Sequence, residues 1–248
     1  MWPNRRLMDL FRIEHPILLA PMAGAMDFDL AIAVAEGGGL GSLPAAMLTA
    51  ERLREHVEKF RARAGKPINL NFFCHTPPVP SNTREDLWRE RLKPYYRELA
   101  IDPAAPIPTS NRAPFDAAFC AVVEDIKPEV VSFHFGLPET GLLRRVKAAG
   151  ARVVGCATTV KEARWLEEHG VDAVIAQGVE AGGHRGMFLS DDVAGQAGSF
   201  ALIPQIVDAV QIPVIAAGAI SDARGIAAAF VLGAAGVQIG SVTRRNVV

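Results

Sequence analysis

Short apolar segments alternate with helix-like segments along nearly the whole chain. Eight segments rich in Ala, Val, Ile and Leu have the pattern of buried strands, and they span residues 17–20, 40–43, 68–73, 130–135, 152–158, 173–178, 213–218 and 236–241. Alternating strands and helices form parallel sheets, and eight such units close into a barrel. We therefore expect an α/β fold, a TIM (β/α)8 barrel, in one domain over residues 1–248. An open doubly wound sheet is the alternative.

The segments between these strands carry the start and stop signals of helices. They cover residues 27–36, 49–64, 139–149, 159–169, 201–210 and 222–232. Thr49 and Thr159 suit N-caps, and Asp222 brings a carboxylate to the positive end of its helix. Gly150 and Gly170 stand where two helices should stop.

The interval 75–128 breaks this rhythm. It begins with HTPPVPSNT, continues with a charged amphipathic stretch at 84–99, and ends with a helix-like segment at 115–126. We interpret it as an elaborated, insertion-like connection after the third strand. Such connections lie on the face formed by the carboxyl ends of the strands, where barrel enzymes place their sites.

The carboxyl end is also irregular. After the last strand only VTRRNVV remains, which is too short for the eighth helix of a barrel. We expect either a short natural tail or a shortened C-terminus that lacks the last helix and part of the cover over the site.

Composition favours a small-molecule partner. The net charge of −1 gives no general attraction to nucleic acid, and no apolar run approaches the length of a membrane span. The three cysteines are far apart, without zinc-like spacing, and the amino end lacks the apolar core of a signal peptide. These features predict a cytoplasmic protein, with no nucleic acid or membrane as partner and no metal site. Cys74 and Cys156 end apolar strands and are expected to be inert packing.

Two glycine turns suggest a phosphate site. AAGAISDARG ends a strand at Gly218, and QIGS, residues 238–241, ends the next. In barrels the loops after strands seven and eight often bind phosphate through backbone N–H groups. The early cluster EGGGLGS follows a helix and precedes a strand, which is the wrong order for a dinucleotide fingerprint.

Several other side chains fall at expected strand ends. Met22 in APMAG suits an apolar contact with a flat ring, or gap-filling core packing. Asn71 and Gln177 are amides that could bond a ligand edge.

Two histidines are candidates for chemistry. His134 by itself is more often a satisfied core histidine than a catalytic one. His184 follows Gly182 and Gly183 in a loop, QGVEAGGHRGM, and could act as a general base near neutral pH. Arg185 could bind an anionic substrate or pair with Glu180.

With these segments in order, the chain resembles the nitronate monooxygenase family. The matching pieces run from about residue 15 to 241 and are HPILLAPMAG, GGGLGSLPAA, NLNFF, VVSFHFGLP, QGVEAGGHRG, SFALIPQIVDAV, PVIAAGAISDARG and GVQIGS. The resemblance implies an FMN-dependent barrel. Carried over by position, the FMN contacts would be Met22, Asn71, Gln177, Gly182, Gly218, Gln238, Ile239, Gly240 and Ser241. His184 would be the catalytic base, with His134 and Arg185 on the substrate side.

The implied reaction is oxidation of an alkyl nitronate, such as propionate 3-nitronate, by O2 to a carbonyl compound and nitrite. Relatives that share the EAGGH loop supply an alternative, an NADH-dependent FMN reductase of the enoyl-acyl-carrier-protein reductase or NADH:quinone reductase type. A third possibility is a truncated, inactive flavin-binding protein, because family members continue well beyond the segment that ends here at Ser241.

Overall fold

The expected barrel is present. A computed structural model describes residues 2–106 and 112–240, and within them eight parallel strands hydrogen-bond in the order β1-β8-β7-β6-β5-β4-β3-β2. The bridge between Leu18 and Leu40 joins the two ends of this sheet, where Leu19 N donates to Leu40 O at 3.0 Å. The strands are β1 (Ile17–Leu19), β2 (Gly41–Pro44), β3 (Ile68–Phe73), β4 (Val130–His134), β5 (Arg152–Ala157), β6 (Ala173–Gln177), β7 (Val214–Ala217) and β8 (Gly236–Ile239).

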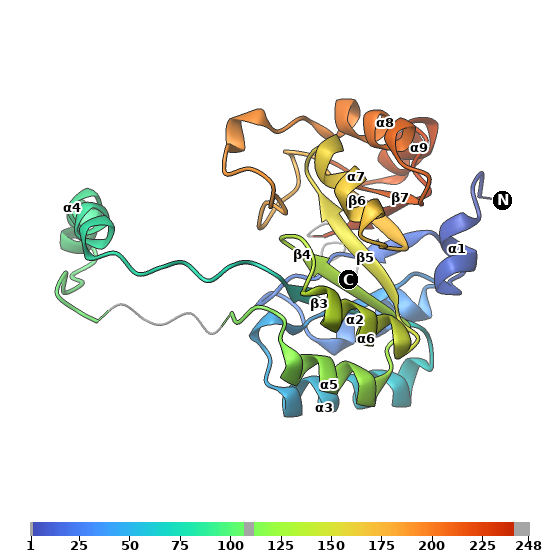
Figure 1. Ribbon diagram of the computed structural model, residues 1–248, viewed down its shortest axis with the longest axis horizontal. Helices are drawn as coiled ribbons and strands as arrows, with labels where there is room; N and C mark the ends of the chain where they lie inside the picture. Colours follow the sequence, from blue (N-terminus) through green and yellow to red (C-terminus); the bar gives the residue numbers. More distant parts are fainter. Residues whose placement is uncertain (1, 107–111, 241–248) are drawn as a thin grey trace.

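The helices of the described residues are α1 (Arg6–Phe11), α2 (Phe28–Glu36), α3 (Ala50–Ala64), α4 (Asn82–Glu98), α5 (Ala117–Ile126), α6 (Thr140–Ala148), α7 (Val160–Glu168), α8 (Ser199–Ala209) and α9 (Ala223–Val231), with short 3-10 turns η1 (Ala45–Met47) and η2 (Val193–Gly195). Apart from α1 and α4, these helices cover the outside of the barrel, as Figure 1 shows. Among the described residues, no helix is long and apolar enough to cross a membrane. Residues 241–248, where the eighth helix would begin, lie outside the described range.

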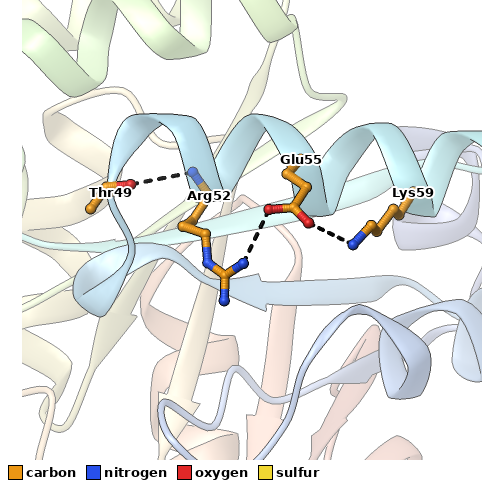
Figure 2. A network of polar contacts seen from close by, with 4 residues as sticks. All are labelled: Thr49, Arg52, Glu55 and Lys59. Atoms are coloured by element: carbon orange, nitrogen blue, oxygen red, sulfur yellow. Dashed lines mark hydrogen bonds and ion pairs between the residues drawn. The ribbon is translucent and has the colours of Figure 1, made fainter.

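The expected helix signals act as predicted. Thr49 accepts a hydrogen bond from Arg52 N, Thr159 caps α7, and Asp222 caps α9. Figure 2 shows the first turns of α3 after the cap. There Glu55 forms solvent-exposed ion pairs with Arg52 and Lys59. Such exposed pairs contribute only a few tenths of a kcal/mol each. The stability of α3 therefore comes mainly from its buried face.

Side chains alternate between two cores. One face of each strand packs against the helices, for example Val153 and Val174. The opposite face fills the barrel interior with Leu18, Val154, Ile175 and Ile215 among others. The same interior cluster includes Leu7, Met8 and Phe11 of α1, the helix that the sequence pattern did not predict. In Figure 1, α1 lies on the opposite side of the strands from α4.

The connection after β3 leaves the barrel body. We call residues 74–114 the arm; within it, residues 107–111 lie outside the described range. Helix α4 stands away from the barrel in Figure 1 and has no buried residue. The arm returns at Phe115, whose N–H donates to Phe73 O at 2.7 Å. The elaborated connection is therefore confirmed, and both of its ends lie at the carboxyl end of β3.

Candidate functional site

A cleft of about 610 Å³ opens at the carboxyl ends of the strands. Its size is typical of small-molecule and cofactor sites. The strand ends and loops that line it bring together Met22, Asn71, His134, Gln177, His184, Gly218, Gln238 and Gly240 among others. A second hollow of about 430 Å³ lies between the amino-terminal segment and α9, but its lining, which includes Trp2, Ile226 and Phe230, is apolar. It offers no group that could react with or orient a polar ligand.

His184 lies in the loop between β6 and α8 and packs beside two aromatic rings that also contact each other at 5.1 Å. The rings of Phe73 and Phe135 approach it edge-on, with centroid distances of 5.3 and 5.8 Å. Phe135 has a φ of 67°, an uncommon conformation for a bulky residue, so its backbone is strained where the ring meets His184. Partial desolvation, followed by the charges of Arg112 and His75, lowers the pKa of His184. The imidazole is therefore mainly neutral at neutral pH, as a general base requires.

Gln177, the last residue of β6, holds the backbone on both sides of Arg185. Its Nε2 donates to His184 O at 3.0 Å, and its Oε1 accepts from Gly186 N at 2.7 Å. Gly186 must be glycine, because a Cβ there would lie 2.6 Å from Cys156 Sγ. The last glycine of QGVEAGGHRGM thus allows the loop to approach β5 closely.

His134, the last residue of β4, contacts the same carbonyl. Its Nε2 lies 3.2 Å from His184 O. Burial lowers the pKa of His134 to about 4, so the ring is neutral near pH 7. A carbonyl only accepts hydrogen bonds, so this contact requires the tautomer with the proton on Nε2.

Two carboxylates fix the rest of the loop. Glu162 of α7 is buried and accepts from the N–H groups of Phe188 and Leu189 through Oε1, and from Thr158 through Oε2. Glu180 accepts from Ser199 N and Oγ at 2.8 and 2.7 Å. The Glu162 hydrogen bonds hold the middle of the loop against α7, and the Glu180 hydrogen bonds join the beginning of the loop to the start of α8.

Arg185 contributes to the loop itself. Its Nη1 donates to the carbonyls of Gly178 and Val179. Among the described residues Arg185 forms no direct pair with Glu180, which was one of the two alternatives left open by the sequence; Glu180 is engaged by Ser199 instead.

Seven of the nine predicted cofactor contacts line the cleft: Met22, Asn71, Gln177, Gly182, Gly218, Gln238 and Gly240. Asn71 donates its amide to Ser132 Oγ at 3.0 Å. The side chain of Ile239 instead packs in the core between the strands and the helices. Its backbone carbonyl accepts a hydrogen bond from Ala20 N. Ser241 lies outside the described residues.

The glycines of the cleft fit a bound planar or phosphate-bearing ligand. A Cβ added at Gly182 would meet nothing within 4 Å, and one at Gly240 would make only ordinary contacts with Ala20 and Met22. Packing within the protein therefore does not require glycine at these two positions, whereas close approach of a ligand to the backbone would. Gly218 and Ala219 follow β7 with φ of 113° and 58°. Consecutive turns of this kind can direct backbone N–H groups at an anion.

Some cleft residues were not singled out from the sequence. Arg112 comes from the return of the arm, and Phe73 comes from the end of β3. Phe135, which follows β4, does not line the cleft but contacts the ring of His184. Cys156 was expected to be inert, and burial raises its pKa to about 12, which keeps it a thiol. Burial also raises the pKa of Cys74. Within residues 2–106 and 112–240, no three His, Cys, Asp or Glu side chains gather as metal ligands would.

Taken together, the closed parallel barrel and the cleft at its carboxyl face define a (β/α)8-barrel protein built to hold a small molecule beside a histidine loop. Residues 4–243 match the family model described as nitronate monooxygenase, so the chain belongs to the nitronate monooxygenase family.

Individual relatives agree with this assignment. The chain is 43% identical over 241 residues to a nitronate monooxygenase of Paraburkholderia phytofirmans, an alignment that covers 96% of this chain and 65% of the relative. The crystal structure of nitroalkane oxidase from Streptomyces ansochromogenes matches with a TM-score of 0.84 at 38% identity, covering 96% of this chain and 67% of that one. FabK from Thermotoga maritima matches with a TM-score of 0.72 at 33% identity, covering 100% and 64%. The chain thus spans about two thirds of the length of these relatives.

Proposed function

We propose that this chain holds FMN in the cleft and oxidises alkyl nitronates, such as propionate 3-nitronate, with O2 to a carbonyl compound and nitrite. The observation that carries the proposal is the convergence of the His184 loop and the two glycine turns on one cleft. Membership of a flavin-dependent family supports the cofactor. The backbone left open by Gly182 and Gly240 supports a ligand that lies against it.

Residues of the cleft would hold FMN in two groups. Gly218, Gln238, Gly240 and the backbone of Ile239, with Ser241 beyond the described residues, would hold the phosphate end. Met22, Asn71, Gln177 and Gly182 would face the ring. When bound, FMN supplies the redox chemistry, because it can accept electrons from the substrate carbon and pass them to O2.

His184 would act on neutral nitroalkanes. Its neutral imidazole can take a proton from the carbon next to the nitro group, which converts the nitroalkane to a nitronate. A nitronate has already lost that proton and needs no base. Phe73 and Phe135 contact the His184 ring edge-on and limit its positions.

The absorption spectrum of the purified protein tests this function. We expect a flavin spectrum, bleached by anaerobic mixing with propionate 3-nitronate in the absence of NADH. A flavin that stays oxidised would count against the proposal. Protein that is colourless and cannot be reconstituted with FMN would also count against it.

The similarity to FabK supports a second candidate, an NADH-dependent FMN reductase of the enoyl-acyl-carrier-protein reductase or NADH:quinone reductase type. Anaerobic bleaching by NADH, without bleaching by the nitronate, would favour it. Oxygen consumption with the nitronate and no NADH would favour the first proposal.

A further inference from the structure

The cleft has an uneven distribution of charge. Its ionisable lining, within the described residues, comprises Arg112, His134, Cys156, Glu180 and His184. Both histidines have lowered pKa values and are mainly neutral at pH 7, and burial keeps Cys156 a thiol. Glu180 is held by the N–H and hydroxyl groups of Ser199. Within the part of the lining that the structure describes, Arg112 is thus the side chain that remains positive at neutral pH.

The position of Arg112 is set from the barrel rather than from the far end of the arm. Three residues later, Phe115 N donates to Phe73 O at 2.7 Å. The Phe115 ring packs edge-on against Phe72 and Phe133, with centroid distances of 4.9 and 5.2 Å. This anchor keeps Arg112 close to the end of β3. Arg112 is also near enough to His184 for its charge to act on the imidazole.

We propose that Arg112 binds a second anionic group of the substrate, a carboxylate, and so makes the site selective for acid-bearing nitronates over simple alkyl nitronates. This inference rests on the proposed function. A guanidinium stays charged at every physiological pH and can donate two parallel hydrogen bonds to a carboxylate. In the proposed function the reacting carbon lies in the same cleft, which His184 and Arg112 both line. A short carbon chain that starts there can place its acid end against Arg112.

Arg112 therefore acts on substrate choice and not on the chemical step. A nitronate without a carboxylate gains nothing from Arg112, whereas a carboxylated one loses a charge-assisted hydrogen bond when Arg112 is replaced. Such bonds correspond to about 1.5–3 kcal/mol, or roughly ten- to a hundredfold in binding.

The test compares two nitronates in three proteins. The wild type, Arg112→Gln and the matched control Arg91→Gln are assayed with propionate 3-nitronate and with ethyl nitronate. Arg91 lies on α4, where it stacks over Trp88 at 5.5 Å and does not line the cleft. We expect Arg112→Gln to lower kcat/KM for propionate 3-nitronate about ten- to a hundredfold, with little change for ethyl nitronate. Arg91→Gln should change neither value. Equal losses with both substrates, or no loss with either, would overturn the role of Arg112.

A binding measurement keeps this result separate from catalysis. Succinate has the same chain length as propionate 3-nitronate, with a second carboxylate in place of the nitronate, and it undergoes no flavin chemistry. We expect calorimetry to show succinate binding that weakens at least about tenfold in Arg112→Gln and is unchanged in Arg91→Gln. If the wild type oxidises neither nitronate, the proposed function fails. Succinate binding then decides the inference alone: dependence on Arg112 supports it, and equal binding, or none, in wild type and Arg112→Gln refutes it.

Discussion

The side chain of Gln177 holds the backbone of His184 in place. Its amide nitrogen donates to His184 O at 3.0 Å, while its oxygen accepts from Gly186 N at 2.7 Å. Gln177 is the last residue of a barrel strand, so the loop takes its position from the sheet. The conformation of the loop that carries His184 is therefore held by hydrogen bonds within the protein, as rigid positioning of the proposed base would require.

Replacing Gln177 with Leu should loosen this loop. The change removes both hydrogen bonds and leaves the buried Gly186 N–H without its partner, which costs about 1–3 kcal/mol of unfolding free energy. Thermal unfolding measures the loss. The matched control is Gln205→Leu on the exposed side of α8, where Gln205 donates to Ala201 O of its own helix. If the two variants unfold at the same temperature, the amide of Gln177 does not hold the loop.

Replacing Glu162 with glutamine should destabilise the protein. Its carboxylate accepts from Phe188 N and Leu189 N on one oxygen and from Thr158 on the other. Glu162→Gln places an NH2 group against backbone donors, which should destabilise the protein by about 1–3 kcal/mol and expose residues 188–189 to hydrogen exchange. Glu168→Gln, on the exposed end of the same helix, is the control. Unchanged exchange at 188–189 would contradict the prediction.

The sequence predicts the barrel well because each strand is a local apolar run. The exact residue at which a strand ends is predicted less well. Residues 130–135 read as one strand, but β4 stops at His134, because Phe135 adopts a positive φ to place its ring beside His184. Helix α1 was missed for a different reason. Its six residues are too few to show a repeating helical pattern of apolar residues. Leu7, Met8 and Phe11 are buried because they pack into the barrel interior.

Some residues of the candidate site can be predicted from local sequence, whereas others reach it only through the fold. His184, Gln177 and Gly182 stand in one short motif, so their sequence neighbours identify them. Arg112 lies far from that motif in the chain, within a proline-rich connection, and only the return of the arm to β3 brings it to the cleft. Glu162 carries the pattern of an ordinary helix residue. Glu162 is buried because the segment around Phe188 folds over it, and the sequence near Glu162 does not predict this contact.

Two glycine substitutions should separate ligand contact from backbone strain. Gly182→Ala adds a methyl group into open space, so stability should stay within about 0.5 kcal/mol of wild type while FMN affinity falls. Gly218→Ala places a Cβ at a φ of 113° and 3.1 Å from Ala181 N, which should cost about 1–3 kcal/mol. Denaturant unfolding of the FMN-free proteins and fluorescence titration with FMN measure the two effects. Full FMN affinity in Gly182→Ala would remove Gly182 from the cofactor contacts.

His134 should make the protein less stable in mild acid. Its folded pKa of about 4 lies below the ordinary value of 6.5, so between these pH values the unfolded chain binds more protons. The stability that depends on a neutral His134 is complete above pH 6.5 and falls as the pH drops toward 4, by about 1–3 kcal/mol. Urea unfolding at pH 7.5 and 4.5 measures this change. His134→Gln keeps a donor for His184 O but should show a smaller loss; identical losses would show that His134 does not carry it.

His184 should matter for nitroalkanes and much less for nitronates. A nitroalkane must lose a proton from carbon before it can be oxidised, and a positioned base contributes about a hundred- to ten-thousandfold to such a step. His184→Asn should lower nitroalkane turnover by this order and nitronate turnover far less. His169→Asn, at the exposed end of α7, is the matched control. Because the pKa of His184 is lowered, kcat/KM of the wild type for a nitroalkane should fall with decreasing pH only below about pH 6.5. Equal losses with both substrates in His184→Asn would mean that the imidazole positions the substrate and does not remove its proton.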